Sequence, residues 1–282
     1  MNINWYPGHM KKTKESIQQN LKMVDIVFEL IDARIPYSSK NPIIDSLLGQ
    51  KPKIIILNKS DLSNSHTTKL WQEYFFNQGV KSVCLDSLNG KGIDKLIELS
   101  YEATDLKRKA YENRGVINRP TRAMILGIPN VGKSTLINSL SGRKGAKVGN
   151  RPGITKSNQW IKTRGGLELL DTPGILWPKF EDKEVGLNLA FTGAIKDEIL
   201  DTETLALKLI ERLIEFSPDL LEKRYNIIIQ GNEALVVMED IAKKRGSIIR
   251  GGEIDYTKVS NIVLDEFRKG IIGNITLEFP KE

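Results

Sequence analysis

Short apolar runs alternate with longer, more polar segments up to about residue 170. The apolar runs predict buried β-strands at residues 24–31, 53–57, 81–87, 123–126 and 167–170. Between them, residues 10–22 predict a polar helix, residues 92–113 predict a longer one, and Asn41-Pro42 is typical of a helix cap and first turn. Strands separated by helices indicate an α/β fold.

The pattern changes after Pro178. Apolar residues then recur at the spacing of one helix face, which predicts about four amphipathic helices, at residues 183–197, 202–215, 232–245 and 256–268. A chain of 282 residues is long enough for two domains. We therefore predict an α/β domain at residues 1–178 and a smaller helical domain at residues 179–282.

The strand at residues 123–126 leads into a phosphate-loop pattern, Gly127-Ile128-Pro129-Asn130-Val131-Gly132-Lys133-Ser134. A helix should begin near Gly132 and direct its first N–H groups at phosphates, with Asn130, Val131 and Thr135 lining the loop. Lys133 would reach the outer phosphates, and the Ser134 hydroxyl would ligate Mg²⁺. A strand-to-helix turn that matches by chance is the alternative, and the complete pattern in this context argues against it.

An earlier strand delivers Asn58-Lys59-Ser60-Asp61 at its carboxyl end, where ligands bind in open α/β sheets. Asp61 can accept two hydrogen bonds from guanine, whereas adenine has no matching pair of donors. Lys59 would lay its methylene stem along the base, and Asn58 would tie this loop to the phosphate loop. Alone, the four residues are equally typical of a solvated turn. Beside a phosphate loop, they favour GTP over ATP.

The next strand ends at Asp86-Ser87, which would place Ser87 and nearby backbone N–H groups against the guanine carbonyl oxygen. The distance from Asp61 fits a neighbouring strand. A plain strand followed by a polar turn is an equally good interpretation.

Two further segments have the sequences of GTPase switches, Gly153-Ile154-Thr155 and Asp171-Thr172-Pro173-Gly174. Thr155 would close on Mg²⁺ and the terminal phosphate, Asp171 would hold the metal through water, and the Gly174 N–H would sense the γ-phosphate. Either segment in isolation is typical of an ordinary loop or turn. The four motifs together favour a nucleotide switch.

This order, with the base motif ahead of the phosphate loop, resembles the circularly permuted GTPases. Trp5-Tyr6-Pro7-Gly8-His9-Met10 and Asp32-Ala33-Arg34-Ile35-Pro36 match the branch that acts in bacterial ribosome biogenesis, as does the segment from Asp171 to Pro178. The resemblance covers essentially the whole chain. It implies a Ras-like, doubly wound P-loop sheet in permuted order, with a smaller all-helical C-terminal domain that binds RNA or the ribosome. It also implies a GTPase that binds a precursor of the large (50S) ribosomal subunit with GTP and leaves after ribosome-stimulated hydrolysis.

Hydrolysis needs a group that orients the attacking water. Ras-type GTPases place a glutamine directly after the glycine of the second switch, and this chain has Ile175 there, so we expect slow unassisted turnover, on the order of 10⁻³ s⁻¹ or below. A neutral His9 could accept a hydrogen bond from that water. The residues alone favour a surface or helix-capping histidine, and the resemblance implies a catalytic one. The resemblance also implies a potassium ion at Asn130, where a helix-start asparagine is the alternative.

Charge is divided unevenly along the chain. Residues 1–178 carry 27 Lys and Arg against 15 Asp and Glu, whereas residues 179–282 carry 15 against 20. The basic part fits an RNA backbone, with binding that weakens as salt rises, and a solvated face is the alternative. We expect ribosomal RNA and ribosomal proteins as partners, and neither DNA nor a membrane. The single Cys84 excludes an internal disulfide, and the lack of a signal-like or membrane-spanning run favours a cytoplasmic location.

Two other classes of function stay open at this point. A GTP-sensing RNA-binding scaffold would not need hydrolysis. A metabolic P-loop phosphotransferase would need adenine specificity and a second-substrate pocket, and Asp61 argues against it.

Overall fold

The computed structural model describes residues 10–142, 159–171, 182–197, 200–229, 231 and 233–281. Its strands are β1 (Ile26–Asp32), β2 (Lys53–Asn58), β3 (Lys81–Leu85), β4 (Thr121–Gly127), β5 (Gln159–Lys162) and β6 (Leu167–Asp171). The helices around the sheet are α1 (Met10–Leu21), α2 (Pro36–Ser39), α3 (Pro42–Leu48), α4 (Ser65–Asn77), α5 (Ile93–Glu112) and α6 (Lys133–Ser141). The later helices are α7 (Lys183–Phe191), α8 (Thr202–Phe216), α9 (Pro218–Tyr225), α10 (Ala234–Arg245) and α11 (Tyr256–Arg268).

The strands form one sheet in the order β3-β2-β1-β4-β6-β5. Every pair is parallel except β5 with β6. The chain builds β1, β2 and β3 outward in one direction and then returns to place β4 on the other side of β1. The strand order therefore reverses between β1 and β4, and open α/β sheets bind ligands outside the carboxyl ends of the strands at such a point.

The central strands are buried on both faces, which explains why their sequences are continuous apolar runs. Successive residues still point to opposite sides. Phe28 packs with Leu96 of α5 and Leu136 of α6 on one face, and Val27 packs with Ile17 of α1 on the other. Helices thus cover both faces, as the doubly wound fold class predicts.

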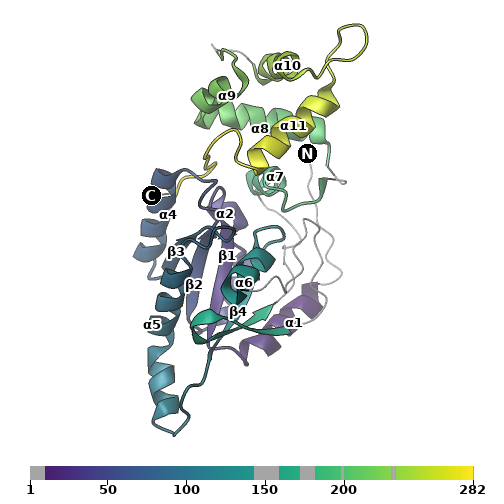
Figure 1. The fold of residues 1–282 in the computed structure, drawn as a ribbon. Coiled ribbons are helices and arrows are strands. Elements are labelled where there is room, and N and C mark those ends of the chain that lie inside the picture. Colours follow the sequence, from purple (N-terminus) through teal and green to yellow (C-terminus); the bar gives the residue numbers. More distant parts are fainter. Residues whose placement is uncertain are drawn as a thin grey trace.

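Helices α7 to α11 gather at one end of the sheet, above α2 in Figure 1. Helix α8 lies at their centre and packs against α7, α9, α10 and α11. Its buried residues follow the 3.6-residue period: Leu205, Ala206, Leu209, Ile210 and Leu213. Helix α7 also packs against α2. The helical part and the α/β part are therefore packed together as well as connected along the chain.

After α11 the chain returns to the α/β part and ends beside α4 (Figure 1). Hydrogen bonds fix this C-terminal tail, residues 270–281, on the α/β part. Among them, Trp71 Nε1 donates to Glu278 O at 3.0 Å, Leu277 N donates to Arg34 O at 2.8 Å, and Ile275 N donates to Leu62 O at 3.0 Å. The last residues therefore pack on the α/β part and also contact the helices, where the Phe279 ring stacks on Phe216 of α8 and Glu278 Oε1 accepts from Asn188 Nδ2 of α7 at 2.9 Å.

The strands and long helices predicted from the sequence are confirmed, with four differences. Strand β5 and the short helices α2 and α9 were missed. Helix α7 ends at Phe191 instead of residue 197, because Gly193 has a φ of 74° that a helix does not continue. Helix α9 had a signal, Pro218 in its first turn, that we did not use.

Candidate nucleotide site

The loop between β4 and α6 lies at the point where the strand order reverses. Asn130 and Gly132 have φ angles of 57° and 103°, which turn the backbone into α6. A Cβ at Gly132 would lie 2.4 Å from Asn58 Nδ2. Both the conformation and the space therefore require glycine at position 132.

Lys133 is the first residue of α6. Its ammonium lies over its own loop, where Nζ donates to Gly127 O at 3.1 Å and to Ile128 O at 2.9 Å. Ser134 and Thr135 are half-buried in the same first turn, the part of a helix whose N–H groups and dipole favour anions. The structure thus places the predicted phosphate-binding residues together at one helix start.

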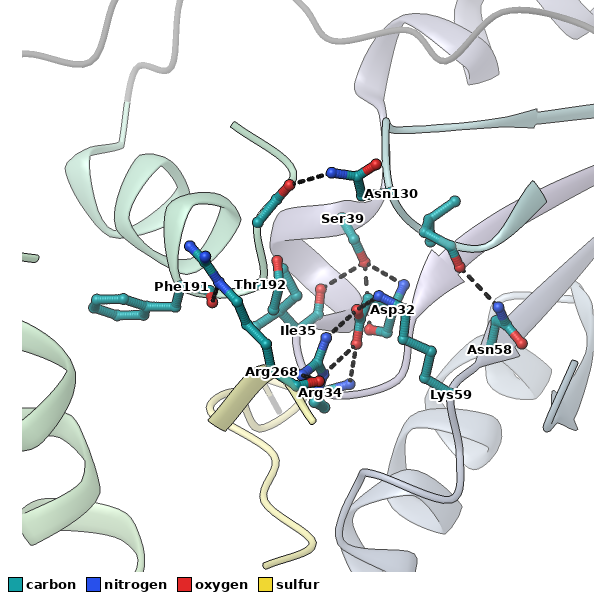
Figure 2. Close-up of polar contacts among 12 residues, drawn as sticks. Asp32, Arg34, Ile35, Ser39, Asn58, Lys59, Asn130, Phe191, Thr192 and Arg268 are labelled. Atoms are coloured by element: carbon teal, nitrogen blue, oxygen red, sulfur yellow. Dashed lines mark hydrogen bonds and ion pairs between the residues drawn. The ribbon is translucent and has the colours of Figure 1, made fainter. Parts of the chain in front are cut away.

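Asn58 joins the base motif to the phosphate loop. Its Nδ2 donates to Val131 O at 2.7 Å, and its Oδ1 accepts from Ser87 N at 3.2 Å and from Ser87 Oγ at 2.6 Å. The side chain is almost fully buried, with 1% exposed. The tie expected between Asn58 and the phosphate loop is therefore present, and one amide connects three loops that lie far apart in the sequence (Figure 2 shows Asn58 and its bond to the phosphate loop).

Asp61 lies at the exposed end of the same loop. Partial burial, together with the negative charges of Asp86 and Asp32, raises the pKa of its carboxyl above the ordinary value. Two N–H donors would stabilise the charged form of a carboxylate in that setting, and the edge of guanine presents two such donors. Ser60 N donates to Leu85 O at 3.2 Å, so the loop is also fixed to the end of β3.

Asp86 shapes the turn that follows β3. Its carboxylate accepts from Leu88 N at 3.0 Å, from Asn89 N at 3.1 Å and from Asn89 Nδ2 at 2.7 Å. The side chain is buried with those partners. Its described contacts are thus within the turn that presents Ser87, and Ser87 itself is held by Asn58.

A polar cluster at the end of β1 contacts and supports the base loop, residues 58–61 (Figure 2). The Asp32 carboxylate accepts from Arg34 Nε at 2.9 Å, from Arg34 Nη2 at 2.7 Å and from Lys59 Nζ at 2.9 Å. Burial alone would raise the pKa of Asp32, and the two cations instead hold it well below its usual range. Burial lowers the pKa of Lys59, and the Asp32 charge opposes that effect.

The phosphate loop also contacts the helical part directly. Asn130 Nδ2 donates to Gly193 O, just after α7, at 2.7 Å (Figure 2).

Four predicted residues fall wholly or partly outside the described ranges. His9, Thr155 and Gly174 lie outside them, and of Asp171 only the backbone is described, as the last residue of β6. Because β6 is parallel to β4, that residue lies at the same edge of the sheet as the phosphate loop.

The described part of the chain contains no group of three or more His, Cys, Asp or Glu side chains placed to hold a metal ion. Its helices also include none with the length and apolar character needed to cross a membrane.

The fold and these contacts define a P-loop GTPase of circularly permuted strand order. Residues 122–238 match the family model of the 50S ribosome-binding GTPases. The chain is 47% identical to Ribosome biogenesis GTPase A of Bacillus pumilus, with both chains covered completely, and 31% identical to the protein of that name in Thermotoga maritima, over 99% of this chain and 95% of that one. The chain therefore belongs to the Ribosome biogenesis GTPase A family.

Solved structures agree with this assignment. A GDP-bound TM YlqF structure aligns with a TM-score of 0.66 at 28% identity, over 95% of this chain and 100% of that one. The GNP-bound YlqF from T. maritima aligns with a TM-score of 0.64 at the same identity, over 96% and 99%. Membership in the family establishes GTP and GDP as the nucleotides and GTP hydrolysis as the activity.

Sequence reasoning did not assign a role to the cluster beneath Lys59. Asp32 and Arg34 were noted only for their resemblance to the family. The available signal was an acidic and a basic residue placed directly after the fully buried strand β1, at the edge where ligands bind. The contacts from the C-terminal tail had no comparable signal.

Proposed function

We propose that this GTPase is a switch in late assembly of the large ribosomal subunit. It binds the precursor particle with GTP and is released after hydrolysis that the particle stimulates. The name of the family, Ribosome biogenesis GTPase A, and the match to the 50S ribosome-binding GTPases support a role in ribosome assembly. A cytoplasmic location and a division into domains at residue 178 belong to the same proposal.

The observation that carries the proposal is the bond between Asn58 and Val131, 2.7 Å long. It joins the loop of Asp61 to the loop of Lys133. One nucleotide can then place guanine on Asp61 and its phosphates at the start of α6, with Gly132 allowing close approach of the backbone. Ser60, Ser87, Val131, Thr135 and Gly174 are proposed to complete the pocket.

The donor set at the start of α6 fits a hydrated magnesium ion. The Ser134 hydroxyl would hold it, with Thr155 and Asp171 completing the set, and the ion would neutralise charge on the β- and γ-phosphates. Potassium at Asn130 would add a second positive charge. His9 is proposed to accept a hydrogen bond from the attacking water, because Ile175 cannot.

Residues 1–178 carry more basic than acidic side chains, which supports RNA as the part of the particle that this protein binds. Such binding should weaken steeply between low and high salt, because Lys and Arg displace counterions from the phosphate backbone. Ribosomal proteins complete the proposed partner.

The guanine assignment is tested by replacing Asp61 with Asn. The variant should lose affinity for GTP and gain affinity for xanthosine triphosphate, whose 2-oxo group offers an acceptor where guanine offers a donor. Titration of both nucleotides into both proteins measures the exchange. An unchanged preference for GTP would remove Asp61 from the base site.

Particle-stimulated hydrolysis is tested by single-turnover assays with and without immature large subunits. We expect stimulation in the unaltered protein and its loss in His9→Ala. His66→Ala is the matched control, because His66 is the other histidine and lies exposed on α4. Binding of the particle without stimulation would favour the GTP-sensing scaffold, and stimulation that survives in His9→Ala would remove the proposed role of His9.

A further inference from the structure

The cluster beneath the base loop is built around one buried carboxylate. Asp32 is 1% exposed, and it accepts a fourth hydrogen bond from Arg34 N at 3.1 Å besides those from the two side chains. Attraction within a buried ion pair roughly offsets the cost of removing both charges from water. An ion pair at the ligand edge of the sheet therefore calls for an explanation other than fold stability.

Lys59 shows what the carboxylate does locally. Its φ is 58°, a left-handed conformation that residues with a side chain adopt rarely and that persists where the surroundings fix it. The backbone sets one end of the side chain, and the bond from Nζ to Asp32 sets the other. Between these two points the four methylene groups have little freedom, although a free lysine has many rotamers.

Arg34 fixes the carboxylate from the opposite side. Its Nε and Nη2 atoms form the two-pronged contact with Asp32, and its Nη1 donates to Phe267 O at 3.4 Å and Arg268 O at 3.3 Å. Those carbonyls end helix α11, where cations are favoured by the dipole. The guanidinium also lies 5.3 Å from the centre of the Phe267 ring. One arginine therefore joins the support of the base loop to the helical part.

The C-terminal tail closes the same arrangement. Asn274 Nδ2 donates to Asp61 O at 2.8 Å, Asn64 N donates to Thr276 Oγ1 at 3.0 Å, and Ile275 N donates to Leu62 O. These bonds follow the base loop along its backbone and leave the Asp61 carboxylate for the ligand. The loop is thus held from α11 and the tail together.

We propose that Asp32 is a positioning residue for guanine binding: it holds the Lys59 ammonium so that the lysine stem is already in place against the base, and Arg34 anchors that support on the end of α11. Affinity for the nucleotide then depends on a contact between the two parts of the chain. The proposal rests on the placement of guanine at Lys59 and Asp61 under the proposed function.

The test uses the full chain and a fluorescent GTP analogue. Asp32→Asn keeps the shape but weakens the hold on Lys59. We expect the dissociation constant for GTP to rise about tenfold, which corresponds to about 1.4 kcal/mol. The kcat at saturating GTP should stay unchanged, since no reacting atom is touched. The affinity for inosine triphosphate, which lacks the 2-amino group of guanine, should fall by the same factor. Asp61 still recognises that group in GTP, so the ratio of the two affinities should not change.

Glu29→Gln is the matched control. Glu29 is a buried carboxylate on the same strand, paired with Lys53 at 2.9 Å, and lies away from the base loop. It should affect unfolding but not the affinity for GTP. Equal losses of affinity in Asp32→Asn and Glu29→Gln would overturn the proposal, as would a fall in kcat with unchanged KM in Asp32→Asn.

Lys59→Met provides a second approach that does not disturb the buried pair. It keeps an apolar stem and removes the ammonium, and the side chain is already 23% exposed. Its effect and that of Asp32→Asn should not add in the double variant, because both break one contact. Additive losses would overturn the proposal even if GTP remains preferred. If only Asp61→Asn weakens GTP binding, and Asp32→Asn and Lys59→Met bind GTP as tightly as the unaltered protein, the proposed function stands without the role of Asp32.

Discussion

Replacing Asn58 with Ala tests whether one buried amide holds the two nucleotide loops together. The substitution removes the donor to Val131 O and the acceptor of two bonds from Ser87. It leaves the backbone of β2 unchanged, because Asn58 is the last residue of a strand paired on both sides. The effect should therefore come from the side chain.

The magnitude follows from the bonds that are lost. Each is worth about 1 kcal/mol net, and the carbonyl and the N–H that remain are buried beside the deleted group. We expect about 2 to 3 kcal/mol of lost stability, a large share of the 5–15 kcal/mol typical of a domain. Part of that energy fixes the distance between Asp61 and Lys133. GTP should then bind at least about tenfold more weakly, the equivalent of about 1.4 kcal/mol.

Urea unfolding and GTP titration measure the two effects separately. Ser87→Ala separates the contributions of the bonds, because it deletes only the 2.6 Å bond to Asn58 Oδ1 and keeps the bond from Asn58 to Val131. It should cost about 1 kcal/mol of stability and lose less GTP affinity than Asn58→Ala. If Asn58→Ala loses stability as expected but binds GTP within twofold of the unaltered protein, the amide supports the fold and does not organise the site.

Three further outcomes are expected. Gly132→Ala should abolish GTP binding in a folded protein, because its Cβ would lie 2.4 Å from Asn58 Nδ2 on a backbone with a φ of 103°, and a titration that still shows binding would contradict this. Asp32 has a pKa in the folded state below its unfolded value of about 3.9, so the stability that it contributes is present above that pH and is lost as the pH falls below it. In Asp32→Asn the free energy of unfolding should therefore depend less steeply on pH in that acid range. An equal slope in the variant and the unaltered protein would refute the assignment. Deleting residues 275–282 removes the acceptor of Trp71 Nε1, so the fluorescence emission of that tryptophan should shift to the red. The variant Trp71→Phe identifies the share of the signal that comes from Trp71. An unshifted spectrum would count against docking of the tail.

The sheet was predictable because its strands are buried on both faces. Continuous runs such as residues 53–57 need no alternation to be recognised, and each is followed by turn or loop residues. The phosphate loop was predictable for a related reason. Gly132 meets both a steric and a conformational requirement, so the position leaves little choice of residue.

The support beneath the base loop was not predictable from the same reasoning. Asp32 and Arg34 are near in the sequence, and Lys59 follows the neighbouring strand. The other partners of Arg34, however, are two backbone carbonyls far along the chain, at Phe267 and Arg268. Carbonyls have no sequence signature. The tail contacts share this property, because Leu277 and Ile275 use their backbone N–H groups on carbonyls of the α/β part. Long-range backbone bonds of this kind become visible only in a structure.

The permuted order explains why such contacts fall on both sides of the nucleotide. The next described element after β6 along the chain is α7 of the helical part, and the base loop comes before both. The helical part is thus joined to the phosphate side through Gly193 and Asn130, and to the base side through Arg34 and the tail. Exchange of GTP for GDP changes only the phosphate side. We therefore expect the base side, with its contact between Arg34 and the end of α11, to remain attached during the cycle.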